Sequence, residues 1–229
     1  KNNKKEILDL IYEKEKIIND FEEKFIDRYN FLIEYQNKKY ADQYKELVDY
    51  VKKHEENIKV DVKNFSNAVA INYFKLMSYK DEYEVARLYS NNEFISKINE
   101  TFEGNFKINF HLSPPIFYKK DKVTGNPLKM NFGSWALNLF KFISKFKFLR
   151  GTIFDIFGYF EERKIERLLI NKYKNLIQEI CPKLTTDNYS IAVEIASVPD
   201  QIRGFGYIKK KNIEIAKNCE NRLMSMFNG

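Results

Sequence analysis

The stretch of residues 64–77 reads NFSNAVAINYFKLM and sets the class of fold. Its large apolar side chains recur at steps of four and three, which is the spacing of one helix face. These side chains are Phe65, Val69, Tyr73, Leu76 and Met77. The pattern predicts an amphipathic helix, and helical spacing continues on both sides of it.

The first third of the chain also has helical spacing. An apolar series at alternating steps of four and three runs through residues 7–35, and a second helical pattern follows it. Lys14 and Arg28 interrupt the series, so it indicates an antiparallel helical hairpin or a bundle edge and not an extended coiled coil. Residues 52–59 are polar and are the best candidate for a linker. We therefore predict a helical arm over residues 1–58.

The period changes once, in the middle of the chain. Within residues 106–110 phenylalanine and isoleucine alternate with lysine and asparagine, which is the pattern of a half-buried strand. Residues 121–127 contain Thr-Gly-Asn-Pro and predict a turn. Residues 128–132 can then form the returning strand. The sequence predicts a β hairpin near residues 106–132.

Helical patterns return in the second half. Ser134 is the expected N-cap of a helix that runs to Lys147. Residues 151–158 are expected to form a loop, another helix begins near Glu161, and a last helix ends the chain. The patterns together predict a mainly α fold with a small β hairpin, of the α+β class. In this fold the helical arm precedes a compact, mostly helical domain over residues 64–229.

The composition indicates the cellular compartment of the protein but says little about its activity. Of the 229 residues, 44% are hydrophobic and 31% charged, which is ordinary for a soluble globular protein. Two cysteines, Cys181 and Cys219, are too few for a disulfide scaffold and fit a reducing cytosol. No apolar run reaches the roughly 20 residues that span a membrane. We expect a cytoplasmic location and, because the chain begins with Lys1 and not Met, a segment of a longer protein.

The search for catalytic chemistry finds no candidate. Two separated cysteines cannot supply an iron–sulfur cluster, and His54 and His111 stand alone, so no metal ligands are predicted. The eight glycines are dispersed and do not form a phosphate-cradling loop. Gly204-Phe205-Gly206 opens a helix and could present N–H groups to an anion, but the pattern favours a simple helix-to-helix bend. We assign no catalytic, cofactor-binding or metal-binding residue.

The positive charge of the chain is concentrated in one segment. The net charge is +7, and residues 107–150 alone carry nine basic residues against the single Asp121, a net charge of +8. Aromatic residues are interleaved with these basic ones. The candidate partner-docking residues of this segment are Lys119, Lys120, Lys122, Lys129, Lys141, Lys145 and Trp135. Such a surface can dock an acidic protein, bind single-stranded nucleic acid or lie on an anionic membrane, or it can be a core helix whose lysines face water.

Four ordered blocks carry a resemblance to a known family. The blocks are NYFKLMSYKDEYEVARLY (72–89), FHLSPP (110–115), LRGTIFDIFGY (149–159) and PDQIRGFG (199–206). They resemble the carboxy-terminal region of fused bacterial indolepyruvate ferredoxin oxidoreductases, of the 2-oxoacid:ferredoxin oxidoreductase family. The run LIEYQNKKYA (32–41) is similar to the segment just upstream in that family.

The resemblance implies an enzyme as the parent protein. That parent oxidatively decarboxylates arylpyruvates to acyl-CoA with thiamine diphosphate and iron–sulfur clusters, and passes the electrons to ferredoxin. Those cofactor domains lie elsewhere in the parent chain, so the resemblance implies no cofactor and no catalysis in this segment. We expect an accessory or assembly domain that packs against the catalytic domains, within a homo-oligomer of the parent, or docks ferredoxin.

Two alternatives stay open. An independent basic module would bind nucleic acid or an anionic surface, although both partners rank below the protein partners. An autonomous enzyme would need a pocket that gathers a polar cluster whose members are Lys80, Asp81, Glu82, Arg87 and Arg203.

Overall fold

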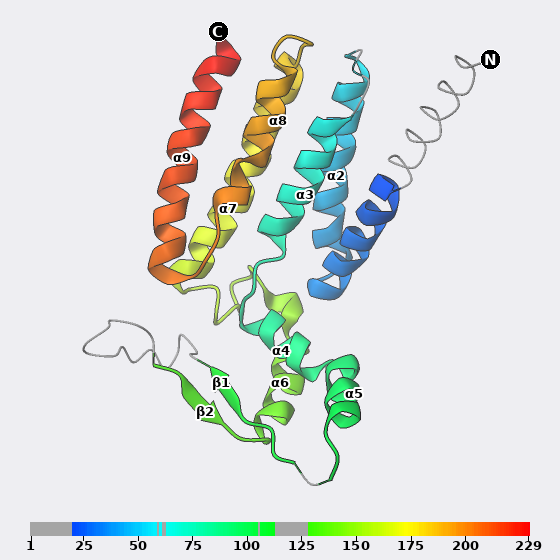
Figure 1. The fold of residues 1–229 in the computed structure, drawn as a ribbon, viewed down its shortest axis with the longest axis vertical. Helices are drawn as coiled ribbons and strands as arrows, with labels where there is room; N and C mark the ends of the chain where they lie inside the picture. The colour runs from blue at the N-terminus through cyan, green and yellow to red at the C-terminus, as the bar shows by residue number, and fades with distance from the viewer. Residues whose placement is uncertain (1–19, 59, 61–62, 105, 113–127) are drawn as a thin grey trace, which may run out of the picture. The chain divides into compact units, whose positions relative to one another are not determined.

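The structure is a computed structural model that describes residues 20–58, 60, 63–104, 106–112 and 128–229. Within these residues the fold is mainly α with one small two-stranded antiparallel sheet, which confirms the predicted class (Figure 1). No helix in the described ranges is long and apolar enough to cross a membrane.

The elements follow one another along the chain. A helix covers residues 20–35 of the described part. The later elements are α2 (Lys38–Glu56), α3 (Asn64–Met77), α4 (Glu82–Ser90), α5 (Asn92–Thr101), β1 (Phe110–Leu112), β2 (Met130–Phe132), α6 (Ala136–Ser144), α7 (Glu161–Ile180), α8 (Tyr189–Ser197) and α9 (Gly206–Asn228). Short 3-10 turns occur at Lys147–Leu149, Cys181–Lys183 and Val198–Gln201.

The chain divides into two compact units. Unit 1 combines Lys1–Ser78 with Leu168–Gly229, and unit 2 is Tyr79–Arg167. This division differs from the predicted one between residues 1–58 and 64–229. The reason is that α2 packs against α3, so the helices on both sides of the predicted linker belong to one unit.

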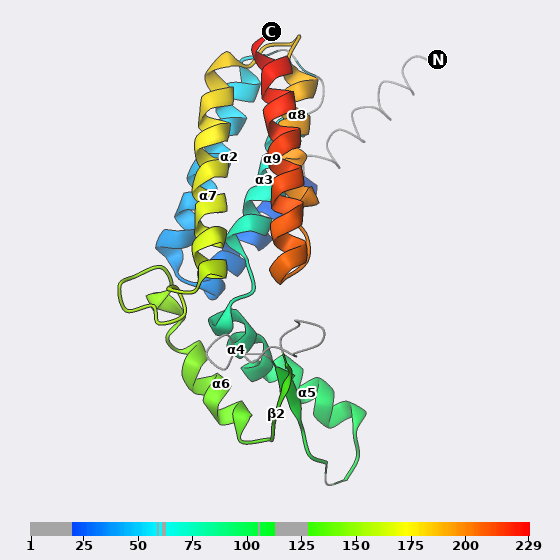
Figure 2. The same cartoon turned by 90° about the vertical axis from the view of Figure 1, so that its left-hand side faces the viewer.

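Unit 1 is a set of long helices that lie side by side (Figures 1 and 2). α3 packs against α2 and α8, and α8 packs against α9. Three buried tyrosine rings cross the core in a stack, with centroids 6.3 Å apart between Tyr44 and Tyr73 and 6.0 Å between Tyr73 and Tyr173. Offset rings at this separation add stabilisation to the apolar area that they bury.

A buried carboxylate from α2 caps the start of α3. Glu55 is 1% exposed, and its Oε1 accepts hydrogen bonds from the Phe65 N–H at 2.9 Å and the Tyr189 hydroxyl at 2.6 Å. Its Oε2 accepts from the Ser66 N–H at 3.2 Å. The first N–H groups of a helix lack partners and form its positive end, so an anion is stabilised there. Glu55 thereby ties α2, α3 and α8 together.

Unit 2 has an apolar core of its own. Ala86 of α4, Phe110 of β1, and Ala136 and Phe140 of α6 are its buried members. The rings of Phe110 and Phe140 meet at 90° with centroids 5.0 Å apart. β1 pairs with β2 so that Phe110 faces Phe132. The sheet and α6 thus close over one side of α4.

Two local predictions in this unit need correction, and a third stays open. The first strand begins at Phe110, the last residue of the predicted stretch 106–110, and the residues before it in that stretch belong to no strand. Ser134 is not the helix cap: α6 begins after Trp135, and the Ser134 hydroxyl donates to the Ile108 carbonyl at 3.3 Å. The Ser134 hydroxyl is used in this tertiary contact and does not cap α6. The predicted turn at 121–127 lies outside the described residues.

Candidate functional site

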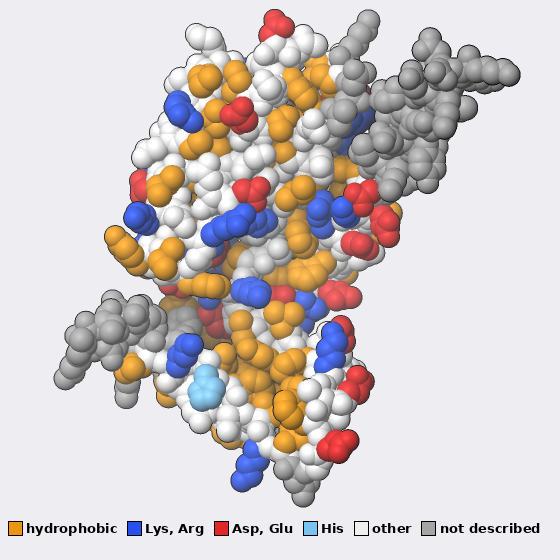
Figure 3. Space-filling view, viewed as in Figure 1, with side chains coloured by type: hydrophobic (Ala, Val, Ile, Leu, Met, Phe, Trp, Pro, Cys, Tyr) orange, Lys and Arg blue, Asp and Glu red, His pale blue; other side chains and the backbone are white. Residues whose placement is uncertain are grey.

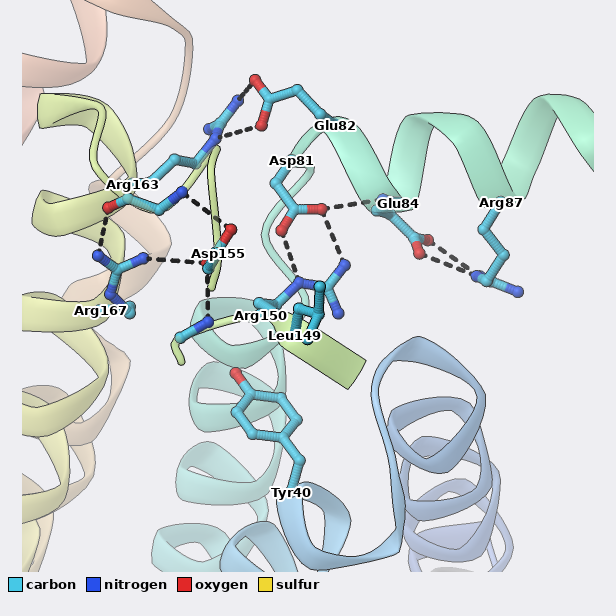
Figure 4. A network of polar contacts seen from close by, with 12 residues as sticks. Tyr40, Asp81, Glu82, Glu84, Arg87, Leu149, Arg150, Asp155, Arg163 and Arg167 are labelled. Carbon is cyan, nitrogen blue, oxygen red and sulfur yellow. Dashed lines mark hydrogen bonds and ion pairs between the residues drawn. The ribbon is translucent and has the colours of Figure 1, made fainter. Parts of the chain in front are cut away.

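The polar centre of unit 2 is a buried ion pair at the start of α4 (Figure 4). Asp81 precedes the helix, and its Oδ1 accepts the Glu84 N–H at 2.9 Å, which is an N-cap. Arg150 donates two hydrogen bonds to the same carboxylate, with its Nε 2.5 Å from Oδ2 and its Nη2 2.8 Å from Oδ1. The side chains are 2% and 3% exposed, so the pair is shielded from water.

Two further pairs involve carboxylates of α4: one joins α4 to α7, and the other lies within α4. Glu82 accepts both donors of Arg163 at 3.1 and 3.0 Å. Glu84 is buried and accepts two hydrogen bonds from Arg87, each 2.9 Å long. Burial alone would lower the pKa of Arg163, but the hydrogen bonds and charge of Glu82 raise it above its ordinary value. Each carboxylate is therefore paired with a guanidinium through charge-assisted hydrogen bonds.

A fourth carboxylate, the buried Asp155, shapes the loop between the 3-10 turn Lys147–Leu149 and α7. Asp155 Oδ2 accepts the Gly151 N–H at 2.7 Å, and its Oδ1 accepts the Gly158 N–H at 2.9 Å. Arg167 stands 3.8 Å from Asp155 Oδ2 and donates to the Gly158 carbonyl at 2.5 Å. A Cβ on Gly158 would overlap the Asp155 carboxylate, so this close approach requires glycine. These four pairs are called the ion-pair network below.

Two tyrosines fill the space beside the network. Tyr83 is buried, its ring meets Phe157 edge to face at 5.0 Å, and the Arg150 guanidinium lies 5.6 Å from its centroid. Burial, followed by the charge of Asp155 and a hydrogen bond to it, raises the pKa of Tyr83. Burial also raises the pKa of Tyr79 to about 12. Both phenols stay protonated at neutral pH, so neither is prepared to act as a base.

The loop held by these contacts exposes its large apolar side chains. We call residues 148–159 the apolar loop. Its exposed members are Phe148, Ile153 (78% exposed), Phe154 (68%), Ile156 (65%) and Tyr159 (64%). The Tyr159 hydroxyl donates to the Ile153 carbonyl at 2.8 Å, which adds a bridge across the loop. The loop thus has a fixed polar interior and an apolar exterior.

This arrangement suits binding better than chemistry. The carboxylates of the network are already paired with arginines, and a general base needs a free lone pair within reach of a substrate proton. Among the residues that the structure describes, no group of His, Cys, Asp and Glu could hold a metal ion. What the site offers to another molecule is the ordered apolar surface.

The predicted polar cluster is only partly brought together. Asp81, Glu82 and Arg87 lie on the same turn and helix, but each contacts a different partner. Lys80 is exposed, and Arg203 belongs to unit 1, where its Nε donates to the Asp200 carbonyl at 2.9 Å. Asp81, Glu82 and Arg87 therefore belong to three separate ion pairs.

The predicted docking residues are exposed wherever the structure describes them. Lys129, Lys141 and Lys145 are exposed, and Trp135 is 60% exposed. The remaining three, Lys119, Lys120 and Lys122, lie outside the described residues. Their role in docking stays a prediction.

A loop over residues 151–158 was predicted, but sequence reasoning missed its exposed apolar surface and missed three arginines of the network, Arg150, Arg163 and Arg167. The available signal was the run LRGTIFDIFGY, which is rich in large apolar residues but has neither helical nor strand periodicity. Such a run between two helices is unusual for an ordinary surface loop.

The fold and the site define a mainly helical domain with two compact units and an ordered apolar loop. A family model described as a family of unknown function (DUF6537) matches residues 21–222, so the chain belongs to this family. The comparison with curated proteins found no match, and neither did the comparison with solved structures.

Proposed function

We propose that this chain is an accessory domain whose task is assembly, and that unit 2 packs its apolar loop against a protein partner. The observation that carries the proposal is the exposure of five large apolar side chains on a backbone fixed by buried ion pairs. Large exposed apolar patches mark interaction sites on soluble proteins. An ordered loop also loses little conformational freedom when it binds, which favours affinity.

The charge of the loop favours a protein partner over a phosphate-bearing one. Between Gly151 and Phe160 only Asp155 and Tyr159 have ionisable side chains, and Asp155 is buried against backbone N–H groups. Cores of protein interfaces are depleted in charge and enriched in aromatic residues. Nucleic-acid binding relies on cations that neutralise phosphates.

The sequence resemblance supports a particular partner. Two of the resembling blocks coincide with the site: residues 149–159 are part of the apolar loop, and residues 72–89 supply Asp81, Glu82, Glu84 and Arg87. We therefore propose that the loop packs against the catalytic domains of an indolepyruvate ferredoxin oxidoreductase-like parent. In this proposal the parent is a cytoplasmic homo-oligomer that decarboxylates arylpyruvates oxidatively, with thiamine diphosphate and iron–sulfur clusters bound in its other domains.

The test is complementation in trans. The chain and the rest of the parent polypeptide are co-expressed, and their complex is measured by size-exclusion chromatography. Ile153→Ser with Phe154→Ser should abolish co-elution, because it removes two exposed anchors without touching the network. The matched control is Phe102→Ser, an exposed aromatic of the same unit outside the loop. Undiminished co-elution of the loop variant, or no complex with the unmodified chain, would reject the proposal.

Exposed lysines beside exposed aromatics favour a second role for the same unit. Lys141, Lys145 and Trp135 could dock an acidic ferredoxin, since opposite fields accelerate encounter. Charge reversal at Lys141 and Lys145 should slow salt-dependent ferredoxin reduction by the parent, whereas Lys80→Glu should not. The same residues would serve the alternative of an independent nucleic-acid module, which a gel-shift titration against salt distinguishes.

A further inference from the structure

Unit 1 has complementary exposed faces on two of its helices. The helix over residues 20–35 and α9 lie at opposite edges of the unit in Figure 1. In the space-filling view, acidic side chains gather over the first edge, and basic and hydrophobic side chains gather where α9 begins (Figure 3). Opposite charges at opposite edges suit contact between copies of one chain.

The acidic edge is one stripe of a helix. Glu23, Ile26, Asp27 and Asn30 are all exposed, and their spacing of three and four places them on one face. Ile26 is 54% exposed at the centre of this stripe. We call these four residues the acidic stripe.

The basic edge has the matching composition. Ile208, Lys211 and Ile215 follow the same spacing on α9 and are exposed, and Lys210 is exposed beside them. Glu214 is the one exposed carboxylate next to this face on α9. The Asn212 side chain on α9 donates to the Arg203 carbonyl at 2.8 Å. This hydrogen bond holds the bend that precedes the helix. We call Ile208, Lys210, Lys211 and Ile215 the basic stripe.

We propose that the basic stripe of one copy packs against the acidic stripe of a second copy of this chain. Each stripe offers a half-exposed isoleucine for the contact core and charges of one sign for its rim, which is the usual anatomy of an interface. Because the two stripes lie on opposite edges, the contact is head to tail and produces a ring or an open series of subunits. A single helix-to-helix contact is small, so the association is reversible and depends on concentration.

This inference is independent of the apolar loop, which belongs to the other unit. The experiment is sedimentation velocity over a wide range of protein concentration, with four forms of the full chain. The reversal Lys210→Glu with Lys211→Glu should weaken self-association about tenfold or more, which corresponds to about 1.4 kcal/mol. Glu23→Lys with Asp27→Lys should weaken it equally, and the form with all four changes should restore it.

The restoration by the combined form is the decisive readout. Lys39→Glu with Lys53→Glu is the matched control, since both lysines are exposed on α2 and the charge change is the same. Circular dichroism of each form shows whether its helices are intact. A monomer at every concentration, or a combined form that stays monomeric, would overturn the proposal. So would binding of the unmodified chain through the basic stripe to vesicles of phosphatidylserine or to an oligonucleotide.

Discussion

The buried pair of Asp81 and Arg150 gives the sharpest prediction about what holds unit 2 together. Replacing Arg150 with Met keeps most of the side-chain volume but leaves the Asp81 carboxylate, 3% exposed, without its guanidinium. Breaking a buried ion pair from one side costs about 3–5 kcal/mol, because the remaining charge stays desolvated. Domain stabilities are about 5–15 kcal/mol, so this single change should remove a large part of the stability of the unit.

The chain provides a convenient reporter for this experiment. Trp135 is its only tryptophan and lies in unit 2, so its fluorescence during urea unfolding follows that unit, while circular dichroism follows all helices. The control is Lys97→Met, which breaks an exposed pair with Glu93 in the same unit and should cost less than about 1 kcal/mol.

A double-mutant cycle separates the ion pair from lost packing. Asp81→Asn keeps an oxygen for the Glu84 N–H and removes the charge. Combined with Arg150→Met, it should cost about 2–3 kcal/mol less than the two single changes added together. Additive costs, or a loss in Arg150→Met no larger than in Lys97→Met, would refute the reasoning.

Two further predictions concern unit 1 and the buried phenols. Glu55→Gln should lower the free energy of unfolding by about 1.5–3 kcal/mol, because it removes the charged acceptor at the start of α3. The control is Glu56→Gln, a change at the neighbouring exposed residue. Equal effects of the two changes on the free energy of unfolding would contradict the capping role of Glu55. Burial raises the pKa of Tyr44 and Tyr79 from 10.0 to about 12. Above pH 10 the unfolded chain therefore binds fewer protons than the folded one, and stability falls as the pH rises towards 12. Part of the phenolate absorbance should then appear only as the circular dichroism is lost, and the full absorbance of all 15 tyrosines with intact helices would contradict this.

The sequence predicted the elements whose pattern is local. The helix that starts at Asn64 was placed correctly, since its apolar residues repeat on one face. The hairpin was placed in the right region, but its first strand was set too early because alternation alone does not show which residues find a partner. The cap at Ser134 failed because that hydroxyl has a tertiary partner.

The candidate site was predictable only in part. Asp81 and Glu82 were selected as polar residues in a resembling block, yet Arg150 pairs with Asp81 across 69 positions and no local pattern indicates such a pair. The apolar loop is harder still, because exposure of Ile153 and Phe154 depends on the buried Asp155 contacts that turn the backbone.

The insertion of unit 2 into unit 1 has a consequence for how the chain folds. The helices of unit 1 before Ser78 can pack against those after Leu168 only when the later helices have been synthesised, and all of unit 2 is synthesised in between. The pair of Glu82 and Arg163 joins the incoming and outgoing segments of the insertion. Once unit 2 has folded, the intervening loop is effectively short, which lowers the entropy cost of closing unit 1 by about 2–3 kcal/mol. Unit 2 would then act as an intramolecular staple, and variants that unfold it should slow the folding of unit 1.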